Sequence, residues 1–219
     1  MLSRKRRASP SFLVPLGGRN PWSGFLGALL ILLSGPALAT PTILVFGDSL
    51  SAAYGIPRES GWVSLLERRL PRYRVINASV SGETTAGGLT RLPGVLAAHR
   101  PLLTIIELGA NDGLRGLPLQ YTARNLEAMI ALAKKQGSEV LLVGMRLPPN
   151  YGPDYTRKFQ TLFAEVAKAR KVRLVPFLLA GMAEQRERYL PDGLHPDARA
   201  QPLLMDNIWR ELKPMLKEK

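Results

Sequence analysis

Serine, histidine and aspartate stand in two short segments of this 219-residue chain where they could carry out nucleophilic catalysis. Ser49 lies in Gly47-Asp48-Ser49, directly after an apolar run, and Asp192 precedes His195 by three residues near the end of the chain. A serine hydroxyl is a weak nucleophile and needs a base that takes its proton during attack. An imidazole can act as that base when a carboxylate holds its other ring nitrogen. Because Ser and Asp are also common helix caps, the pattern alone indicates such a site without establishing it.

The chain has only two histidines that could supply the base, His99 and His195. His99 precedes Arg-Pro at the predicted end of a helix, far from any strand end, where it would be a helix-terminal charge. His195 is therefore the better candidate. The chain has no cysteine, which excludes thiol nucleophiles, disulfides and cysteine zinc sites. Two histidines leave little room for a histidine-rich metal centre, so we expect neither a metal nor a cofactor.

Two further segments could supply hydrogen-bond donors for an oxygen that gains negative charge. Gly82 lies 33 residues after Ser49, and Asn111 lies 29 residues after Gly82, each separation being close to one β-α-β unit. The Gly82 N–H could face a ligand with no side chain in the way, and the Asn111 amide can donate two hydrogen bonds. As alternatives, Gly82 serves a loop that needs positive φ, and Asn111-Asp112-Gly113 forms a turn. The three segments would meet if the strand before Ser49 lay between the other two.

Five short apolar runs predict the buried strands that position these residues, at 43–46, 74–76, 103–106, 140–143 and 172–175. Between them lie segments of helical period, in which apolar residues recur at Leu126, Met129, Ile130 and Ala133, at Phe159, Leu162, Phe163 and Val166, and at Leu204, Ile208 and Leu212. This alternation predicts a three-layer α/β domain with a parallel sheet covered by helices on both faces. Sites in such sheets lie beyond the carboxyl ends of the strands. We also expect Ser49 to begin the helix after the first strand, where backbone N–H groups would favour a developing anion.

The first 39 residues have the pattern of a secretory signal. Residues 1–24 contain five basic and no acidic side chains, residues 25–33 are an apolar run, and Ala37 and Ala39 give a small-x-small end. The apolar run is shorter than the roughly 20 residues that cross a bilayer, so an uncleaved anchor is the weaker interpretation. We expect cleavage after Ala39, leaving one domain over residues 40–219 in the periplasm or outside the cell. The basic stretch is unusually long, which leaves open a true start codon downstream of Met1.

The formal charge of +13 first suggests a nucleic acid or an anionic surface as partner. Five of the positive charges lie in the leader, so residues 40–219 carry 25 basic against 17 acidic side chains, or +8. No binding motif or interleaving of aromatic and basic residues supports a nucleic-acid partner. Transient contact with an anionic membrane surface stays a hypothesis, and we expect a monomer.

Four ordered blocks of the chain resemble those of the SGNH (GDSL) hydrolases: GDSLS at 47–51, the Gly82 segment, GAND at 109–112 and DGLHP at 192–196. The resemblance is closest to the bacterial periplasmic members with arylesterase, acyl-CoA thioesterase and lysophospholipase activity. Longer strings support it: FGDSLSAAYGI at 46–56, NASVSGETT at 77–85, ELGANDGLRG at 107–116 and RLPPNYG at 146–152. It extends over essentially all of residues 40–219 and does not include the leader.

This resemblance implies a role for each candidate residue. Ser49 would be the nucleophile, His195 the base and Asp192 its orienting partner. The backbone N–H groups of Ser49 and Gly82 and the side chain of Asn111 would form an oxyanion hole. The implied fold is a five-stranded parallel sheet in the order 2-1-3-4-5, which would bring the strand ends together. The chain contains no GxSxG string, which argues against the α/β-hydrolase type of nucleophile turn.

The activity implied is hydrolysis of carboxylic esters through an acyl-enzyme, with aryl esters, short-to-medium acyl esters, lysophospholipids and acyl thioesters as candidate substrates. A carbohydrate O-deacetylase on the same catalytic frame is an alternative. A non-catalytic lipid or acyl carrier is a weaker one, because all the candidate catalytic residues are intact. The one departure from close relatives is Ala110, where they often have glycine, and it matters only if this residue needs positive φ.

Four residues are candidate substrate contacts: Leu114, Leu117, Pro148 and Tyr151. The first two lie in residues 113–118, directly after Asn111, where Gly113 and Gly116 would permit movement. We expect this segment to form a mobile, partly apolar wall of an acyl groove, with residues 147–151 opposite. The alternative is a pair of ordinary surface loops.

Overall fold

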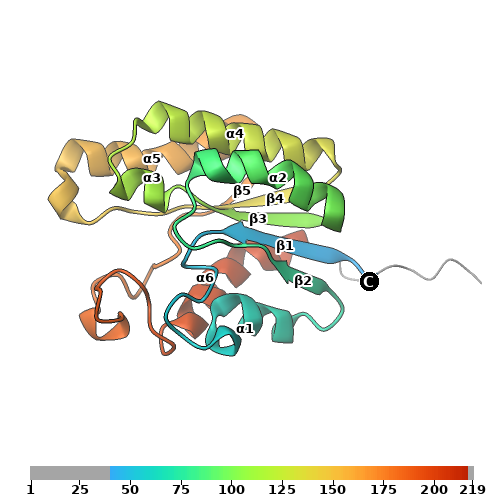
Figure 1. Cartoon of the computed structure of the whole chain (residues 1–219), viewed down its shortest axis with the longest axis horizontal. Coiled ribbons are helices and arrows are strands. Elements are labelled where there is room, and N and C mark those ends of the chain that lie inside the picture. Colours follow the sequence, from blue (N-terminus) through green and yellow to red (C-terminus); the bar gives the residue numbers. More distant parts are fainter. Residues whose placement is uncertain (1–39, 217–219) are drawn as a thin grey trace, which may run out of the picture. The chain divides into compact units, whose positions relative to one another are not determined.

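The computed structural model describes residues 40–216, which contain a five-stranded, all-parallel sheet (Figure 1). The strands are β1 (Thr42–Gly47), β2 (Arg74–Asn77), β3 (Leu103–Glu107), β4 (Glu139–Val143) and β5 (Arg173–Val175). Their order is β2-β1-β3-β4-β5, so β1 lies between β2 and β3 as predicted. The segments that leave β1, β2 and β3 therefore meet at one edge of the sheet.

Helices cover both faces of the sheet, which gives the three layers that the sequence predicts (Figure 1). One face carries α1 (Trp62–Arg69) and α6 (Gln201–Leu212), which contact each other. The other carries α2 (Thr85–His99), α3 (Ala110–Leu114), α4 (Leu119–Lys135) and α5 (Pro153–Arg170), with α4 packed between α2 and α5. Short 3-10 helices are η1 (Arg58–Ser60), η2 (Pro149–Tyr151), η3 (Arg186–Arg188) and η4 (Lys213–Met215).

Apolar periodicity explains why these segments form these elements. Every residue of β3 is buried, as a strand covered by helices on both faces requires. Leu126, Met129, Ile130 and Ala133 of α4 are 0% exposed, so the predicted stripe is the buried face of that helix. On α5 the rings of Phe159 and Phe163 meet edge to face, with centroids 5.3 Å apart. The five predicted strands and the helices predicted from apolar stripes are confirmed, with bounds that differ by a few residues.

The expectation that Ser49 begins a helix is wrong. After β1 the chain makes turns, and the first α-helix begins only at Trp62. A single helical turn does form, in which the Ala52 N–H donates to the Asp48 carbonyl at 3.0 Å. Ala53 then adopts a left-handed φ of 60°, which cannot continue a right-handed helix.

The predicted signal peptide at residues 1–39 and its cleavage after Ala39 lie outside the described residues. In the part of the chain that the structure describes, no helix is both long enough and apolar enough to cross a membrane.

Candidate active site

Ser49 lies in the turn that leaves β1, and its hydroxyl meets a histidine from the far end of the sequence. Ser49 Oγ is 2.9 Å from His195 Nε2. The serine is partly buried, while Asp48 and Leu50 on either side of it are buried. This turn holds the hydroxyl within the distance at which an imidazole can take its proton.

The other ring nitrogen of His195 is held by Asp192. Asp192 Oδ2 lies 2.7 Å from His195 Nδ1, and Asp192 Oδ1 accepts the backbone N–H groups of Leu194 at 2.9 Å and His195 at 3.0 Å. The His195 backbone N–H is the largest of the causes that lower the pKa of Asp192 to about 2, with the Leu194 N–H and the His195 side chain also contributing. Asp192 is thus an anion that fixes both the ring and the loop carrying it.

The face of the imidazole is covered by Tyr54. The rings of Tyr54 and His195 have centroids 4.4 Å apart and planes inclined by 39°. Tyr54 lies in the same turn segment as Ser49, so one loop both presents the hydroxyl and limits rotation of the ring. Three contacts therefore define the position of the imidazole.

Asn111 connects the ends of all three central strands. It lies in α3, and this helix begins directly after Gly109, whose φ of 117° turns the chain sharply after β3. Its Nδ2 donates to Asp48 Oδ2 at 3.0 Å and to the Glu83 carbonyl at 3.0 Å. The carboxyl group follows β1 and the carbonyl follows β2, which is the convergence that the strand order was expected to produce. Both hydrogens of the Asn111 amide nitrogen are engaged in this structure.

Gly82 lies in an exposed loop with φ of 77°. Arg115 Nη2 donates to the Gly82 carbonyl at 3.0 Å, and this contact fixes the peptide beside the Asn111 segment. The left-handed conformation is one that glycine adopts without strain. Ala110, by contrast, is not among the residues with positive φ, so its side chain causes no backbone strain there.

His99 is the last residue of α2, as expected. This helix runs from the carboxyl end of β2 to the amino end of β3. Because the strands are parallel, His99 lies at the edge of the sheet opposite to Ser49. It cannot serve as the base.

The candidate substrate segments contact each other directly. The Tyr151 hydroxyl donates to the Leu114 carbonyl at 3.0 Å, and the Tyr155 hydroxyl donates to the Leu117 carbonyl at 3.0 Å. The sequence predicted residues 147–151 opposite the wall formed by residues 113–118, and the Tyr151 hydrogen bond joins these two segments. Pro148 is exposed at the start of η2.

The two glycines of this region differ. A Cβ on Gly113 would lie 2.6 Å from the Phe159 ring and 2.8 Å from Leu147, so Gly113 is a close-packing residue and not a hinge. Gly116 has φ of 65° and open space around it, and it keeps the freedom that the sequence suggested for both.

Beneath the Ser49 turn lie two buried carboxyls, Asp48 and Glu107, which are 1% and 0% exposed. Glu107 Oε2 accepts the Ser51 hydroxyl at 2.7 Å and the Asp48 N–H at 3.3 Å. Burial raises the pKa of Asp48 to about 6, and burial followed by the charge of Asp48 raises the pKa of Glu107 well above its ordinary value.

The comparison with known families covers most of this domain. Residues 45–201 match the sequence model of the GDSL-like Lipase/Acylhydrolase family. The chain belongs to this family.

Relatives within the family share most of their length with this chain. The esterase TesA of Pseudomonas aeruginosa is 47% identical over 194 residues, which are 87% of this chain and 96% of that protein. The thioesterase 1/protease 1/lysophospholipase L1 of Escherichia coli is 38% identical over 85% of this chain and 90% of its own. The crystal structure of the esterase EstA from Pseudoalteromonas sp., inhibited by monoethylphosphonate, has a TM-score of 0.76 and 39% identity, covering 81% of this chain and 99% of that one.

The structure of this GDSL family member adds residues that the sequence reasoning did not single out. Tyr54 gave no signal except its place in the string after Ser49. Glu107 did give one, since it is a carboxylate at the end of an apolar, fully buried strand. Asp48 was seen as part of GDS, but its contact with Asn111 depends on the fold.

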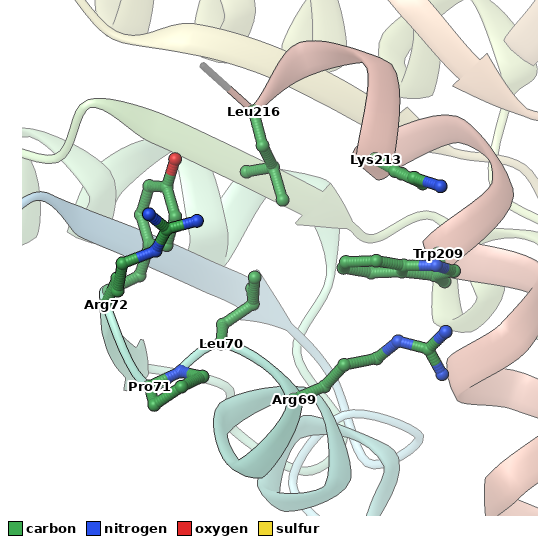
Figure 2. Close-up of a pocket in the computed structure, with 8 residues that line it drawn as sticks. Arg69, Leu70, Pro71, Arg72, Trp209, Lys213 and Leu216 are labelled. Carbon is green, nitrogen blue, oxygen red and sulfur yellow. The ribbon is translucent and has the colours of Figure 1, made fainter. Parts of the chain in front are cut away.

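A cavity of about 350 Å³ lies elsewhere on this family member, where α1 and the end of α6 meet (Figure 2). Its lining combines cationic, aromatic and aliphatic side chains, among them Arg69, Leu70, Trp209, Lys213 and Leu216. Arg69 lies over the Trp209 ring at 4.4 Å and pairs with Asp206 at 3.8 Å. Since α1 and α6 both end at the amino edge of the sheet, this cavity contributes nothing to the Ser49 site.

Proposed function

We propose that this chain is a serine hydrolase of carboxylic esters, with Ser49 as nucleophile, His195 as base and Asp192 as the orienting carboxylate. The observation that carries the proposal is the continuous link from Ser49 Oγ to His195 Nε2 at 2.9 Å and from His195 Nδ1 to Asp192 Oδ2 at 2.7 Å. Membership of the GDSL-like family and the esterases among its relatives support the same activity.

In the first half of the reaction, Ser49 Oγ attacks the ester carbonyl carbon while His195 Nε2 takes the hydroxyl proton. The tetrahedral intermediate collapses when His195 returns this proton to the leaving alcohol, which leaves an acyl group on Ser49. In the second half, water attacks the acyl carbon, His195 takes a proton from the water, and the acid departs as Ser49 regains its hydrogen. Asp192 stays ionised throughout and stabilises the imidazolium.

The oxyanion would be held by the backbone N–H groups of Ser49 and Gly82 and by the Asn111 amide. Since both Asn111 amide hydrogens already have acceptors, the substrate oxygen has to replace one of them. The Glu83 carbonyl is the easier one to displace, because it belongs to the loop at the exposed Gly82, whereas Asp48 is buried. Exchanging the Glu83 carbonyl for the substrate oxygen replaces one acceptor of the amide by another, which limits the reorganisation that the developing oxyanion requires.

The side chains around the site favour an apolar acyl or aryl group. The large hydrophobic residues that are exposed in the described part of the chain lie in segments that leave the carboxyl ends of the central strands, or next to His195. They are Tyr54 after β1, Val80 after β2, Leu117 and Tyr121 after β3, and Leu194 beside His195. Exposed apolar side chains that gather near a site mark a surface for apolar ligands. We therefore propose aryl esters, short-to-medium acyl esters, lysophospholipids and acyl thioesters as the substrate range, with Leu114, Leu117, Pro148 and Tyr151 as candidate contacts.

The proposed location is the periplasm or the medium, after removal of residues 1–39 as a secretory signal. The basic start, apolar run and small-x-small end of this segment support it. Cell fractionation followed by amino-terminal sequencing of the exported protein tests the proposal, which requires a chain that starts at Thr40. The proposed active form is a monomer that contacts anionic lipid surfaces only transiently.

The test of the activity is a substrate panel with the purified wild-type protein. We expect hydrolysis of p-nitrophenyl butyrate and longer acyl esters, and covalent labelling by a fluorophosphonate probe. Activity on acetylated xylan with none on longer acyl esters would identify a carbohydrate O-deacetylase instead. A protein that neither turns over any ester nor reacts with the probe would be a carrier, and the proposal would be wrong.

Acyl specificity is tested with a series of p-nitrophenyl esters of increasing chain length. Replacing Leu114 and Leu117 by alanine should reduce kcat/KM for the longer chains more than for the acetate. Equal effects on all chain lengths would show that these side chains do not contact the acyl group.

A further inference from the structure

Asp48 and Glu107 form a buried pair of acids without a basic partner. In residues 40–216, none of the ion pairs includes either side chain. Two buried carboxylates in contact repel each other and both lose hydration, so ionising both is strongly unfavourable. The charged groups that act on the pair are its own two members and His195. The pair therefore holds one proton more readily than none.

The hydrogen bonds indicate which member keeps the charge. Both Asp48 oxygens accept N–H groups, Oδ1 from Leu50 and Oδ2 from Asn111, each at 3.0 Å. These two N–H donors favour the ionised form of Asp48. Glu107 Oε2 likewise accepts two donors, but its Oε1 is buried with no partner within the described residues. An unpartnered oxygen in an apolar setting costs less as part of a neutral acid than as part of a carboxylate.

The packing shows that this arrangement is built closely into the turn. A Cβ on Gly47 would lie 2.6 Å from Glu107 Oε2 and 2.7 Å from Ser51 Oγ. Glycine at this position is thus what lets the Glu107 carboxyl approach the backbone of the turn. Ser51 is fixed in addition through its carbonyl, which accepts the Asn77 amide at 2.7 Å. The carboxyl of Glu107 is a central support of the segment that carries Ser49.

We propose that Glu107 is a positioning residue that acts as a neutral carboxylic acid, fixing the Ser49 turn through its Oε2 and leaving Asp48 as the single anion beneath the Asn111 amide. This inference rests on the proposed function, because the residues being positioned are the nucleophile and an oxyanion donor. A second anion at this depth would oppose the negative charge that develops on the substrate oxygen. The neutral acid supplies the same two acceptor contacts without that cost.

The test compares two replacements of Glu107 with a control on the same strand. In Glu107→Gln, the amide oxygen can take the place of Oε2 and keep both contacts without charge, whereas Glu107→Met keeps the length and removes the acceptor. Thr104→Val is the control, since it removes another fully buried hydrogen bond of β3, to Ser138 at 2.8 Å, away from the turn. The assay measures kcat and KM for p-nitrophenyl butyrate, together with the thermal unfolding midpoint.

We expect Glu107→Gln to keep kcat within about three-fold and Glu107→Met to lose about ten-fold or more in kcat at nearly constant KM. Thr104→Val should lower the unfolding midpoint and leave kcat unchanged. If Glu107→Gln is as inactive as Glu107→Met, the charge is required and the inference is wrong. It is equally wrong if Glu107→Met keeps its kcat. Should Glu107→Met not fold, Ser51→Ala removes one contact to Oε2 and must still lower kcat by a few-fold.

An infrared difference spectrum tests the proton independently of activity. The spectrum of the wild type minus Glu107→Gln at neutral pH should contain the C=O band of a protonated carboxylic acid. The bands of a carboxylate in its place would overturn the inference. A wild type that hydrolyses no ester and takes up no fluorophosphonate would instead refute the proposed function, and the infrared result would still report the state of Glu107.

Discussion

Ser49 Oγ and His195 Nε2 lie 2.9 Å apart although 146 positions of the chain separate the two residues. Asp192 and Tyr54 hold the imidazole from its other nitrogen and from one face, so the ring is already oriented before a substrate arrives. A preformed contact of this kind needs no rearrangement for proton transfer.

Ser49→Ala should reduce kcat for p-nitrophenyl butyrate by about 10⁴-fold or more and abolish labelling by a fluorophosphonate, because no nucleophile remains. Ser64→Ala is a matched control, since the Ser64 hydroxyl bonds the Arg58 carbonyl in another part of the chain. Labelling of the Ser49→Ala protein would assign the nucleophile to another residue.

Asp192→Asn should lower kcat/KM by about 10²–10⁴-fold. The pKa of Asp192 is lowered to about 2, chiefly by the His195 backbone N–H, so the carboxylate is ionised at every pH from 5 to 8. Any pH dependence of the loss therefore comes from the imidazole, whose charged form Asp192 stabilises. Because the pKa of Asp192 is lower in the folded protein, the ionised side chain stabilises the folded state at pH values above its ordinary pKa of 3.8. This stabilisation is lost as the pH falls through about 2. The measurement is a pH profile of kcat/KM, with Asp154→Asn, on the exposed surface of α5, as control. A loss no larger than that of Asp154→Asn at every pH would contradict the assignment.

Asn111→Ala should reduce kcat by about 10²–10³-fold with a small change in KM, because an oxyanion donor acts mainly in the transition state. Asn125→Ala is the comparison, since Asn125 donates to Thr85 Oγ1 at 3.0 Å on the neighbouring helix and does not reach the site. Steady-state kinetics on one ester separate the two constants. If both variants lose the same kcat, Asn111 is structural and not an oxyanion donor.

Tyr54→Ala should reduce kcat by about three- to ten-fold, since an aromatic contact is worth about 0.5–1.5 kcal/mol and here restrains the His195 ring. Tyr54→Phe keeps the ring and should keep kcat. The experiment compares the two variants on p-nitrophenyl acetate, whose short acyl group has little need of an apolar contact. Equal losses in both variants would indicate that the hydroxyl matters and the ring contact does not.

The free energy of unfolding should depend on pH through Asp48. Its pKa is raised to about 6 by burial, so the folded state binds this proton more tightly than the unfolded state, whose value is near 3.8. The cost of the buried charge is fully present above pH 6 and disappears as the pH falls toward 3.8. Urea unfolding at pH 5 and pH 7 should therefore show the wild type gaining stability at pH 5 relative to Asp48→Asn. Parallel changes in the two proteins would contradict this prediction.

The helices and strands could be predicted from the sequence because local patterns decide them. Buried strands such as β3 are continuous apolar runs, and the stripe of α4 repeats with the helical period. The turn at Ser49 was predicted wrongly, since nothing local reveals that Ala53 has a left-handed φ. Gly113 was taken for a hinge because its packing against Phe159 comes from a helix 40 or more positions away along the chain.

The sequence by itself determined which residue types are available: two serines directly after the first strand, two histidines and no cysteine, and four ordered blocks that resemble a known family. Only the tertiary structure decided how they meet. The strand order brings Asn111 to Asp48 and Glu83, and the packing of β3 under the Ser49 turn buries Glu107 beside Asp48. The physical reason is that hydrogen-bond distances and desolvation depend on neighbours in space, and sequence spacing does not measure these.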